Sequence, residues 1–121
     1  MIKGLHHVAV RTTDIERAAK FYGEVLGFEE VLRLHFEGGD YLIQMVRGGS
    51  MVELFGGGKP ATEDRQEVGF THVALTVDSV DREYERLKGL GCEFYVLPQT
   101  VQGIRCAFFY DPDGNRLELI E

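Results

Sequence analysis

Several features that would mark a secreted or membrane protein are scarce in this sequence. Cysteine occurs twice in 121 residues, as Cys92 and Cys106, and the two do not form a Cys-x-x-Cys pair. Because no secretory segment opens the chain either, this cysteine usage predicts a reduced, cytoplasmic protein. No apolar run approaches the roughly 20 residues that a membrane-spanning helix needs.

Positive charge is also scarce. Lys and Arg number 13 against 20 Asp and Glu, for a formal net charge of −7, and no basic run stands out. This balance argues against nucleic acid or an anionic membrane as a partner and leaves a small molecule as the expected ligand. Hydrophobic residues make up 44% and charged residues 27%, which is typical of a folded globular chain. We expect one domain over residues 1–121.

The chain contains an internal repeat. Gly4-Leu5-His6-His7-Val8-Ala9-Val10 returns as Gly69-Phe70-Thr71-His72-Val73-Ala74-Leu75, a shift of 65 residues. Ser50-Met51-Val52-Glu53-Leu54-Phe55 returns under the same shift as Asn115-Arg116-Leu117-Glu118-Leu119-Ile120. A histidine therefore precedes a glutamate by 46 residues in each copy.

Each copy predicts the order strand, helix and three strands, and thus an α+β fold of two tandem βαβββ modules. In the first copy we expect a buried strand at 5–11. A helix should follow, which opens with a capping box over Thr13–Glu16 and ends at Gly27, and then strands near 28–36, 41–46 and 51–55. In the second copy the matching elements are a strand at 73–78, a helix from Asp78 or Ser79 to Gly89 or Gly91, and strands near 93–97, 104–110 and 116–120. The modules span about 1–56 and 69–121, joined by a flexible linker at about 57–68.

Two histidines and two glutamates at repeated positions form a candidate metal-binding set: His7, Glu53, His72 and Glu118. Side chains alternate faces along a strand, so all four are expected on one face of the sheets. The opposite face would carry residues suited to packing under the helices: Val52, Leu54, Val73, Leu75, Leu117 and Leu119. A duplicated gene also copies purely structural residues, which is the alternative explanation. Against it, a buried glutamate without a counter-charge is costly, and a metal would remove that cost.

Other candidates carry weaker signals. Arg11 and Arg116 share the predicted face of the four metal-ligand candidates, where each either pairs with Glu53 or Glu118 or anchors a substrate carboxylate. We assign His6 and His35, the latter in or near a loop, to the surface, and Cys106 to the core.

Three segments resemble one family. Leu5–Val10, the helix end Phe21–Phe28 and the stretch Phe109–Leu119 are similar to segments of the vicinal oxygen chelate superfamily, the glyoxalase/bleomycin resistance/dioxygenase fold. The resemblance implies paired βαβββ modules that form a curved sheet around a metal cleft, usually in a homodimer. It leaves two arrangements open, with the site inside one chain or shared between subunits.

Within that superfamily the four candidate ligands are most similar to those of glyoxalase I enzymes. Methylmalonyl-CoA epimerases look similar but usually carry glutamine where Glu53 stands. Fe-dependent extradiol dioxygenases and fosfomycin-resistance proteins generally use positions matching His7, His72 and Glu118, and the drug-binding bleomycin-resistance members generally lack the full set. Arg11 resembles a glutathione-contacting arginine of bacterial glyoxalase I, whereas Gly57 replaces an asparagine of those enzymes.

The resemblance therefore implies a metal-dependent lyase or isomerase, similar to lactoylglutathione lyase, that acts on a thiol hemithioacetal or a related oxo-acid through an enediolate. The metal expected is Ni²⁺, Zn²⁺ or Co²⁺ ahead of Fe²⁺ or Mn²⁺, with glutathione or another thiol as a possible co-substrate. Glu118 is the expected proton-transferring base and Glu53 its catalytic partner.

Overall fold

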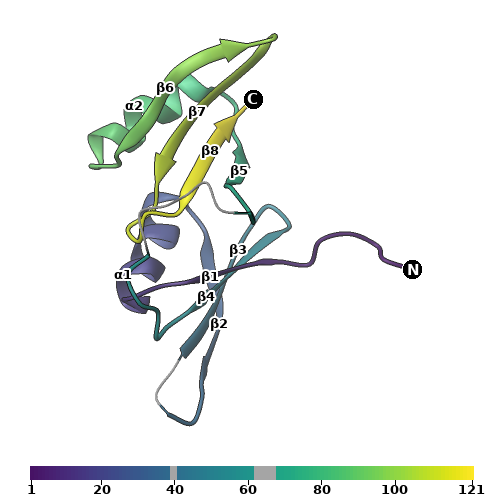
Figure 1. Ribbon diagram of the computed structural model, residues 1–121, viewed down its shortest axis with the longest axis vertical. Coiled ribbons are helices and arrows are strands. Elements are labelled where there is room, and N and C mark those ends of the chain that lie inside the picture. Colours follow the sequence, from purple (N-terminus) through teal and green to yellow (C-terminus); the bar gives the residue numbers. More distant parts are fainter. Residues whose placement is uncertain (39–40, 62–67) are drawn as a thin grey trace. The chain divides into compact units, whose positions relative to one another are not determined.

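The structure, a computed structural model, describes residues 1–38, 41–61 and 68–121. The chain divides into two compact units, Met1–Pro60 and Ala61–Glu121, and Figure 1 shows the strands and helix of each. Both units have the order strand, helix and three strands, so the predicted α+β fold of two βαβββ modules is confirmed. In the described part of the chain, no helix is long and apolar enough to span a membrane.

The first unit consists of β1 (Val8–Arg11), α1 (Ile15–Lys20), a π-helical turn η1 (Phe21–Val25), β2 (Glu29–His35), β3 (Tyr41–Arg47) and β4 (Ser50–Phe55). Its strands form a sheet in the order β1-β4-β3-β2. β1 runs parallel to β4, and the other two pairings are antiparallel. The first and last strands of the unit therefore lie side by side, which brings residues 44 positions apart into register.

The second unit repeats this plan with β5 (Val73–Thr76), α2 (Val80–Gly89), β6 (Phe94–Val101), β7 (Ile104–Tyr110) and β8 (Arg116–Ile120). The sheet order is β5-β8-β7-β6, with β5 parallel to β8. Ala9 lies opposite Glu53 in the first sheet, and Ala74 lies opposite Glu118 in the second. The 65-residue repeat of the sequence is thus also a repeat of strand register.

The core of each unit lies between its helix and one face of its sheet. In the first unit, α1 contacts β3 and β4, and the buried residues include Ala18, Tyr22, Ile43, Met45, Val52 and Leu54. In the second unit, α2 contacts β6, β7 and β8, and the buried residues include Val80, Leu87, Ala107, Phe109, Leu117 and Leu119. The alternation predicted from the sequence therefore holds on β4 and β8, which keep every second side chain beneath the helix.

The start of the first helix differs from the predicted capping box. The N-cap residue is Asp14, whose carboxylate accepts a hydrogen bond from the backbone N–H of Arg17 at 3.1 Å. Glu16 instead forms an ion pair with Arg33 of β2. The capping box over Thr13–Glu16 is therefore wrong, because the aspartate caps the helix and a tertiary ion pair engages the glutamate. The second helix begins as predicted, with Ser79 as its N-cap.

The start of the first strand also differs from the prediction. The strand expected from Leu5 begins only at Val8, because the ladder to β4 starts with the pair Val8 and Val52, and Leu5 is 94% exposed. His35 is the last residue of β2 and is exposed, in agreement with its predicted place near a loop at the surface. Its ring contacts that of Tyr41 with a centroid separation of 4.1 Å.

A two-residue turn fixes the register of the strand that carries Glu53. Gly48 and Gly49 join β3 to β4 with φ angles of 53° and 81°. Positive φ at both central positions is typical of the hairpin turn whose twist matches that of its strands, and glycine adopts it without a steric penalty. This turn lies between the strands predicted near 41–46 and 51–55, in agreement with the sequence analysis.

The predicted linker, residues 57–68, lies partly outside the described residues. Its beginning is bound to the first unit, since the backbone N–H of Gly58 donates to the Thr12 carbonyl at 2.9 Å. A Cβ atom on Gly58 would stand 2.8 Å from that same oxygen, so the close approach requires glycine.

Candidate functional site

The first candidate pair joins a histidine just before β1 to a glutamate on β4. The Nε2 atom of His7 lies 3.0 Å from Oε1 of Glu53. The glutamate side chain is 10% exposed and the histidine side chain 35% exposed. The parallel pairing of β1 with β4 produces this contact, because it sets Ala9 opposite Glu53 and leaves His7 two residues earlier on the same face.

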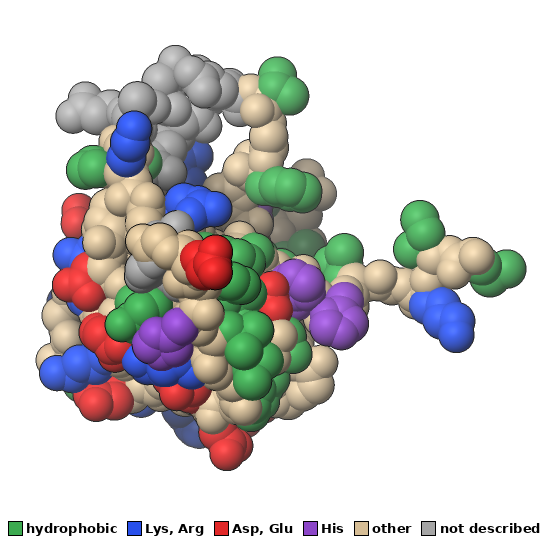
Figure 2. Space-filling model, turned by 90° about the horizontal axis from the view of Figure 1, so that it is seen from below, with side chains coloured by type: hydrophobic (Ala, Val, Ile, Leu, Met, Phe, Trp, Pro, Cys, Tyr) green, Lys and Arg blue, Asp and Glu red, His purple; other side chains and the backbone are tan. Residues whose placement is uncertain are grey.

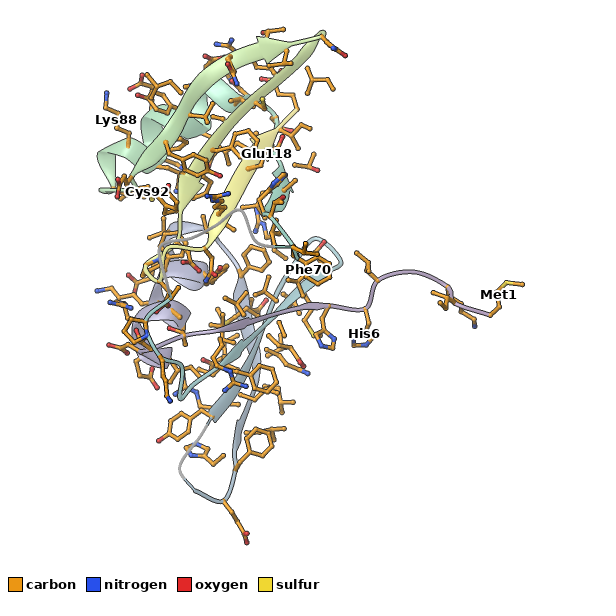
Figure 3. The ribbon with its side chains drawn as sticks, viewed as in Figure 1. Met1, His6, Phe70, Lys88, Cys92 and Glu118 are labelled. Atoms are coloured by element: carbon orange, nitrogen blue, oxygen red, sulfur yellow. The ribbon has the colours of Figure 1, made fainter. Side chains whose placement is uncertain are left out.

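The second pair has the same construction in the other unit. The Nε2 atom of His72 lies 2.8 Å from Oε2 of Glu118, and the side chains are 34% and 12% exposed. Figure 3 shows Glu118 extending from β8. In both units a half-exposed histidine therefore faces a largely buried carboxylate through the same ring nitrogen.

The residue before each histidine holds the other ring nitrogen. Nδ1 of His7 lies 2.9 Å from Nδ1 of His6, and Nδ1 of His72 lies 2.7 Å from the hydroxyl oxygen of Thr71. His6 is exposed, as the sequence predicted, on the segment before β1, and histidine side chains are visible at the surface in Figure 2. A partner on the second ring nitrogen fixes the ring orientation and the tautomer of a histidine ligand. In the sequence, the only indication of these contacts is that His6 and Thr71 occupy the same position of the repeat, directly before each histidine.

The two glutamates differ in their cross-strand neighbours. Gln44 of β3 lies opposite Glu53, and its side-chain amide donates to Oε2 of Glu53 at 2.7 Å. Phe108 of β7 lies opposite Glu118. Its ring packs edge-on against His72 at a centroid separation of 5.2 Å. Glu53 therefore has a partner on each oxygen, whereas Glu118 has a partner on one, within the described part of the chain.

Each pair has donor atoms suited to a divalent metal. Imidazole nitrogen and carboxylate oxygen are both common ligands of Zn²⁺ and of related transition metals. Two ligand atoms at adjacent positions, each about 2.1 Å from an ion, lie about 3 Å apart when the two bonds meet near a right angle. The observed nitrogen–oxygen separations of 3.0 and 2.8 Å fit that requirement.

Both glutamates have a partner in the protein itself. The sequence alone suggested buried carboxylates without a counter-charge, but each glutamate contacts a histidine. Among the described residues no group of three or more His, Cys, Asp or Glu side chains gathers as a metal site, and each unit contributes one pair. The four residues thus stand as two matched half-sets.

Neither Arg11 nor Arg116 forms an ion pair with Glu53 or Glu118 in the described ranges. Arg11 donates to the Gly56 carbonyl at 3.0 Å, and its guanidinium lies 5.7 Å from the centroid of the Phe55 ring. The Arg116 guanidinium lies 5.9 Å from the centroid of the Tyr95 ring, and its buried Nε has no hydrogen-bond partner among the described residues. The sequence left two interpretations of these arginines, pairing with the glutamates or anchoring a substrate carboxylate. Pairing with the glutamates is not observed among the described residues.

Aromatic rings surround the second pair. Tyr95 stacks on Tyr110 at a centroid separation of 4.5 Å and approaches Phe108 at 5.7 Å. Burial raises the pKa of the Tyr95 phenol, while the nearby Arg116 guanidinium acts in the opposite direction. Tyr95 therefore stays neutral at ordinary pH and can donate a hydrogen bond. Cys106 is buried, in agreement with its assignment to the core.

Two βαβββ modules, each with a histidine before its first strand and a glutamate on its last, define the class of protein. The family described as the Glyoxalase/Bleomycin resistance protein/Dioxygenase superfamily matches residues 4–119. The chain belongs to this superfamily, and the resemblance inferred from the sequence is confirmed.

Relatives in this superfamily span the full chain. The uncharacterized protein YwkD of Bacillus subtilis is 34% identical over 126 residues, which cover 100% of this chain and 98% of YwkD. A lactoylglutathione lyase of Pseudomonas aeruginosa is 28% identical, covering 96% of this chain and 81% of its own length. The set of relatives thus includes a protein named as an enzyme.

Solved structures agree over the same length. The crystal structure of SMU.1112c matches with a TM-score of 0.87 and 31% identity, covering 100% of both chains. The E126Q mutant of the fosfomycin resistance protein FosX from Listeria monocytogenes matches with a TM-score of 0.78 and 26% identity, covering 99% of this chain and 93% of FosX. That FosX structure contains Mn(II) and 1S,2S-dihydroxypropylphosphonic acid.

Proposed function

We propose that this protein is a metal-dependent lyase or isomerase of the glyoxalase I type. Its substrate would be a thiol hemithioacetal, with glutathione or another thiol, or a related oxo-acid. The observation that carries the proposal is the matched pair of contacts between His7 and Glu53 and between His72 and Glu118. One histidine–glutamate contact is common in proteins, but the same contact at repeated register in two modules supplies a balanced set of metal ligands.

His7, Glu53, His72 and Glu118 would hold the metal, with Ni²⁺, Zn²⁺ or Co²⁺ preferred over Fe²⁺ or Mn²⁺. When bound, a divalent metal polarises neighbouring substrate oxygens and stabilises the negative charge that develops on them. His6 would orient His7, and Thr71 would orient His72, each through the Nδ1 atom of the oriented histidine. The Nε2 atom of each histidine then faces its glutamate.

Proton transfer is assigned to Glu118, with Glu53 as its catalytic partner. Glu118 would accept a proton from a substrate carbon as the electron pair of that C–H bond moves toward the adjacent carbonyl. The protonated carboxyl would then return the proton to the neighbouring carbon, so the reaction needs no outside oxidant or reductant. The Oε1 atom of Glu118 has no hydrogen-bond partner in the described ranges, which supports this role.

Arg116 and Arg11 are the proposed substrate-binding residues. The buried Nε of Arg116 has no partner within the part of the chain that the structure describes, so Arg116 retains donor capacity for an anionic substrate group. Arg11 already donates to the Gly56 carbonyl, and its remaining N–H groups are the ones available to a carboxylate.

A metal titration followed by an activity assay tests the proposal. Protein stripped with a chelator should regain about one divalent ion per site when Ni²⁺, Zn²⁺ or Co²⁺ is added, and its Tm should rise because the folded state alone assembles the ligands. His7→Ala and His72→Ala should each weaken binding, whereas the exposed His35→Ala serves as the control. The reloaded protein should then isomerise the hemithioacetal of methylglyoxal and a thiol. Unchanged metal affinity in both histidine variants would refute the ligand assignment.

A second candidate is a fosfomycin-resistance function, favoured by the full-length likeness to FosX. The resemblance drawn from the sequence assigns such proteins two histidines and one glutamate, and Glu53 is an additional carboxylate here. Parallel incubation with fosfomycin and Mn²⁺ separates the two candidates, since consumption of fosfomycin without hemithioacetal turnover would select the second.

A further inference from the structure

We propose that Gln44 is a positioning residue that locks the Glu53 carboxylate in its metal-binding orientation and so makes the two glutamates unequal. The inference rests on the metal role proposed for Glu53 and concerns a residue outside the four ligands. Gln44 lies on β3, directly across the sheet from Glu53, and its amide Nε2 donates to Oε2 at 2.7 Å.

Both oxygens of Glu53 are consequently directed. Oε1 faces Nε2 of His7 at 3.0 Å, while Oε2 receives the Gln44 amide. The side chain is only 10% exposed, so water has little access to replace either contact. A carboxylate held at both ends keeps one oxygen aimed at the histidine nitrogen without having to lose rotational freedom when an ion arrives.

The described residues of the second module have no such arrangement. The residue opposite Glu118 is Phe108, whose side chain has no hydrogen-bond donor. The described residues offer Glu118 its contact with His72 and no second donor, although its side chain is also largely buried at 12% exposure. The two modules thus differ in the residue that the neighbouring antiparallel strand places opposite the glutamate, which is Gln44 in the first and Phe108 in the second.

This difference favours different roles for the two glutamates. Glu53, fixed by Gln44, would remain a stationary ligand. Glu118 has one oxygen without a partner among the described residues and an aromatic residue opposite it in place of a donor, so it can rotate to take and return a proton. A ligand whose orientation depends on a hydrogen-bonding neighbour typically loses about 10–100-fold in metal affinity when that neighbour is removed.

The alternative is that Gln44 merely strengthens the pairing of β3 with β4. In that case its loss would lower the Tm of metal-free protein and leave the affinity for metal unchanged. Gln44→Met tests this because methionine is close to glutamine in length and cannot donate a hydrogen bond. Gln99→Met, at an exposed position of β6, makes the same chemical change away from both glutamates.

The experiment measures Zn²⁺ affinity by competition with a chromophoric chelator, the absorption spectrum of the Co²⁺ form, and the Tm of metal-free protein. We expect Gln44→Met to bind Zn²⁺ about 10–100-fold more weakly and to alter the Co²⁺ bands, while Gln99→Met matches the parent. Gln44→Ser, which is too short to reach Glu53, should show the same loss and serves if the methionine variant does not fold.

A Zn²⁺ affinity within about twofold of the parent in the Gln44 variants, with an unchanged Co²⁺ spectrum, would overturn the inference. Glu53→Ala distinguishes that failure from failure of the proposed function. If Glu53→Ala loses Zn²⁺ binding while Gln44→Met retains it, the positioning role alone is wrong. If Glu53→Ala also binds Zn²⁺ as tightly as the parent, the metal role of Glu53 is wrong and the inference falls with it.

Discussion

At the residue scale, a carboxylate with two partners and a carboxylate with one should respond differently to the same substitution. Replacing Glu118 with glutamine keeps its size and an oxygen ligand but removes the basic group. A positioned general base contributes about 10²–10⁴-fold to rate, so Glu118→Gln should lose roughly that much kcat in hemithioacetal isomerisation. The loss of kcat in Glu53→Gln should be smaller. The side-chain amide of Gln44 can flip and accept a hydrogen bond from the amide introduced at position 53.

The comparison between these variants must be made at saturating metal, since weakened coordination would otherwise imitate the loss of a base. Equal and small losses from both substitutions would contradict the assignment of Glu118 and direct attention to water or to an unligated residue. The parallel Zn²⁺ titration provides the control, because it reports coordination independently of turnover.

The four candidate ligands could be predicted from the sequence because a repeat marks equivalent positions and strand alternation marks their face. Gln44 could not be predicted in the same way. Its contact with Glu53 depends on which residues of β3 and β4 face each other, and that register is set by the turn at Gly48 and Gly49. The 65-residue shift aligns Gln44 with Phe109, and the residue that lies opposite Glu118 is Phe108, so the repeat itself contained no signal for this contact.

At the element scale, the segment that follows β4 should tolerate alanine at Gly56 but not at Gly58. A Cβ on Gly58 would meet the Thr12 carbonyl oxygen at 2.8 Å, and this backbone oxygen also accepts the Gly58 N–H. Gly58→Ala should therefore cost about 1–3 kcal/mol of unfolding free energy. The nearest atom to a Cβ on Gly56 is the Tyr41 backbone nitrogen at 3.7 Å, an ordinary contact, so Gly56→Ala is the matched control.

Chemical denaturation of the parent and of both variants measures these costs. Gly56→Ala should fall within about 1 kcal/mol of the parent, because alanine also restricts the unfolded chain. Equal stabilities for Gly56→Ala and Gly58→Ala would show that the start of the linker is not packed against Thr12.

The ion pair between α2 and β7 should make stability depend on pH. Arg105 donates to both carboxylate oxygens of Asp81, at 2.6 and 3.0 Å, and this hydrogen bonding lowers the pKa of Asp81. A carboxyl group whose pKa is lower in the folded state stabilises the fold above its unfolded pKa and loses that effect as pH falls through the folded value. The Tm of the parent should exceed that of Asp81→Asn at pH 7, and the gap should close below about pH 4.

Glu85→Gln provides the control for that measurement, since Glu85 is exposed on the same helix. Its Tm should follow the parent throughout the titration. A gap between the parent and Asp81→Asn that persists unchanged at the acid end would show that the substitution acts through packing or helix propensity rather than through the ion pair.

The helices show where sequence patterns stop being sufficient at this scale. Gly27, with a φ of 82°, follows the first helix as the pattern predicted. The preceding turn, however, is π-helical over Phe21–Val25. The spacing of apolar residues does not distinguish such a turn from an α-helical one, and Tyr22, within this turn, is buried as an apolar position of either helix would be. The pattern also favoured a capping box from Thr13 to Glu16, whereas the Asp14 carboxylate caps the helix and Glu16 pairs with Arg33.

At the scale of the whole molecule, we expect a homodimer. β2 and β6 are edge strands of their sheets and carry exposed apolar side chains, among them Val31, Leu32, Leu34 and Leu97. Exposed apolar edges of this kind are generally covered by a partner. Sedimentation at micromolar concentration should therefore give a mass of two chains, and Leu34→Glu should shift it toward one. A monomer across the whole concentration range would exclude a site shared between subunits.

Subunit mixing decides whether the four ligands come from one chain or from two. In the shared arrangement, His7 and Glu53 of one subunit combine with His72 and Glu118 of the other. His7→Ala and His72→Ala homodimers would each have every site damaged. A mixed dimer would instead place both damaged halves in one site and leave the second site intact. After unfolding and refolding a 1:1 mixture, about one quarter of the parent's tight Zn²⁺ sites should return, because half of the dimers are mixed and each regains one site of two.

If each chain instead holds its own site, mixing restores nothing, since every chain still lacks one histidine. The control is a mixture of His7→Ala with Glu53→Ala, in which both defects lie in the first module. That mixture should remain without tight sites in either arrangement, because each site uses a single first module. Recovery in the first mixture and none in the second would therefore locate the metal between subunits, and it would do so from binding alone, before any substrate is known.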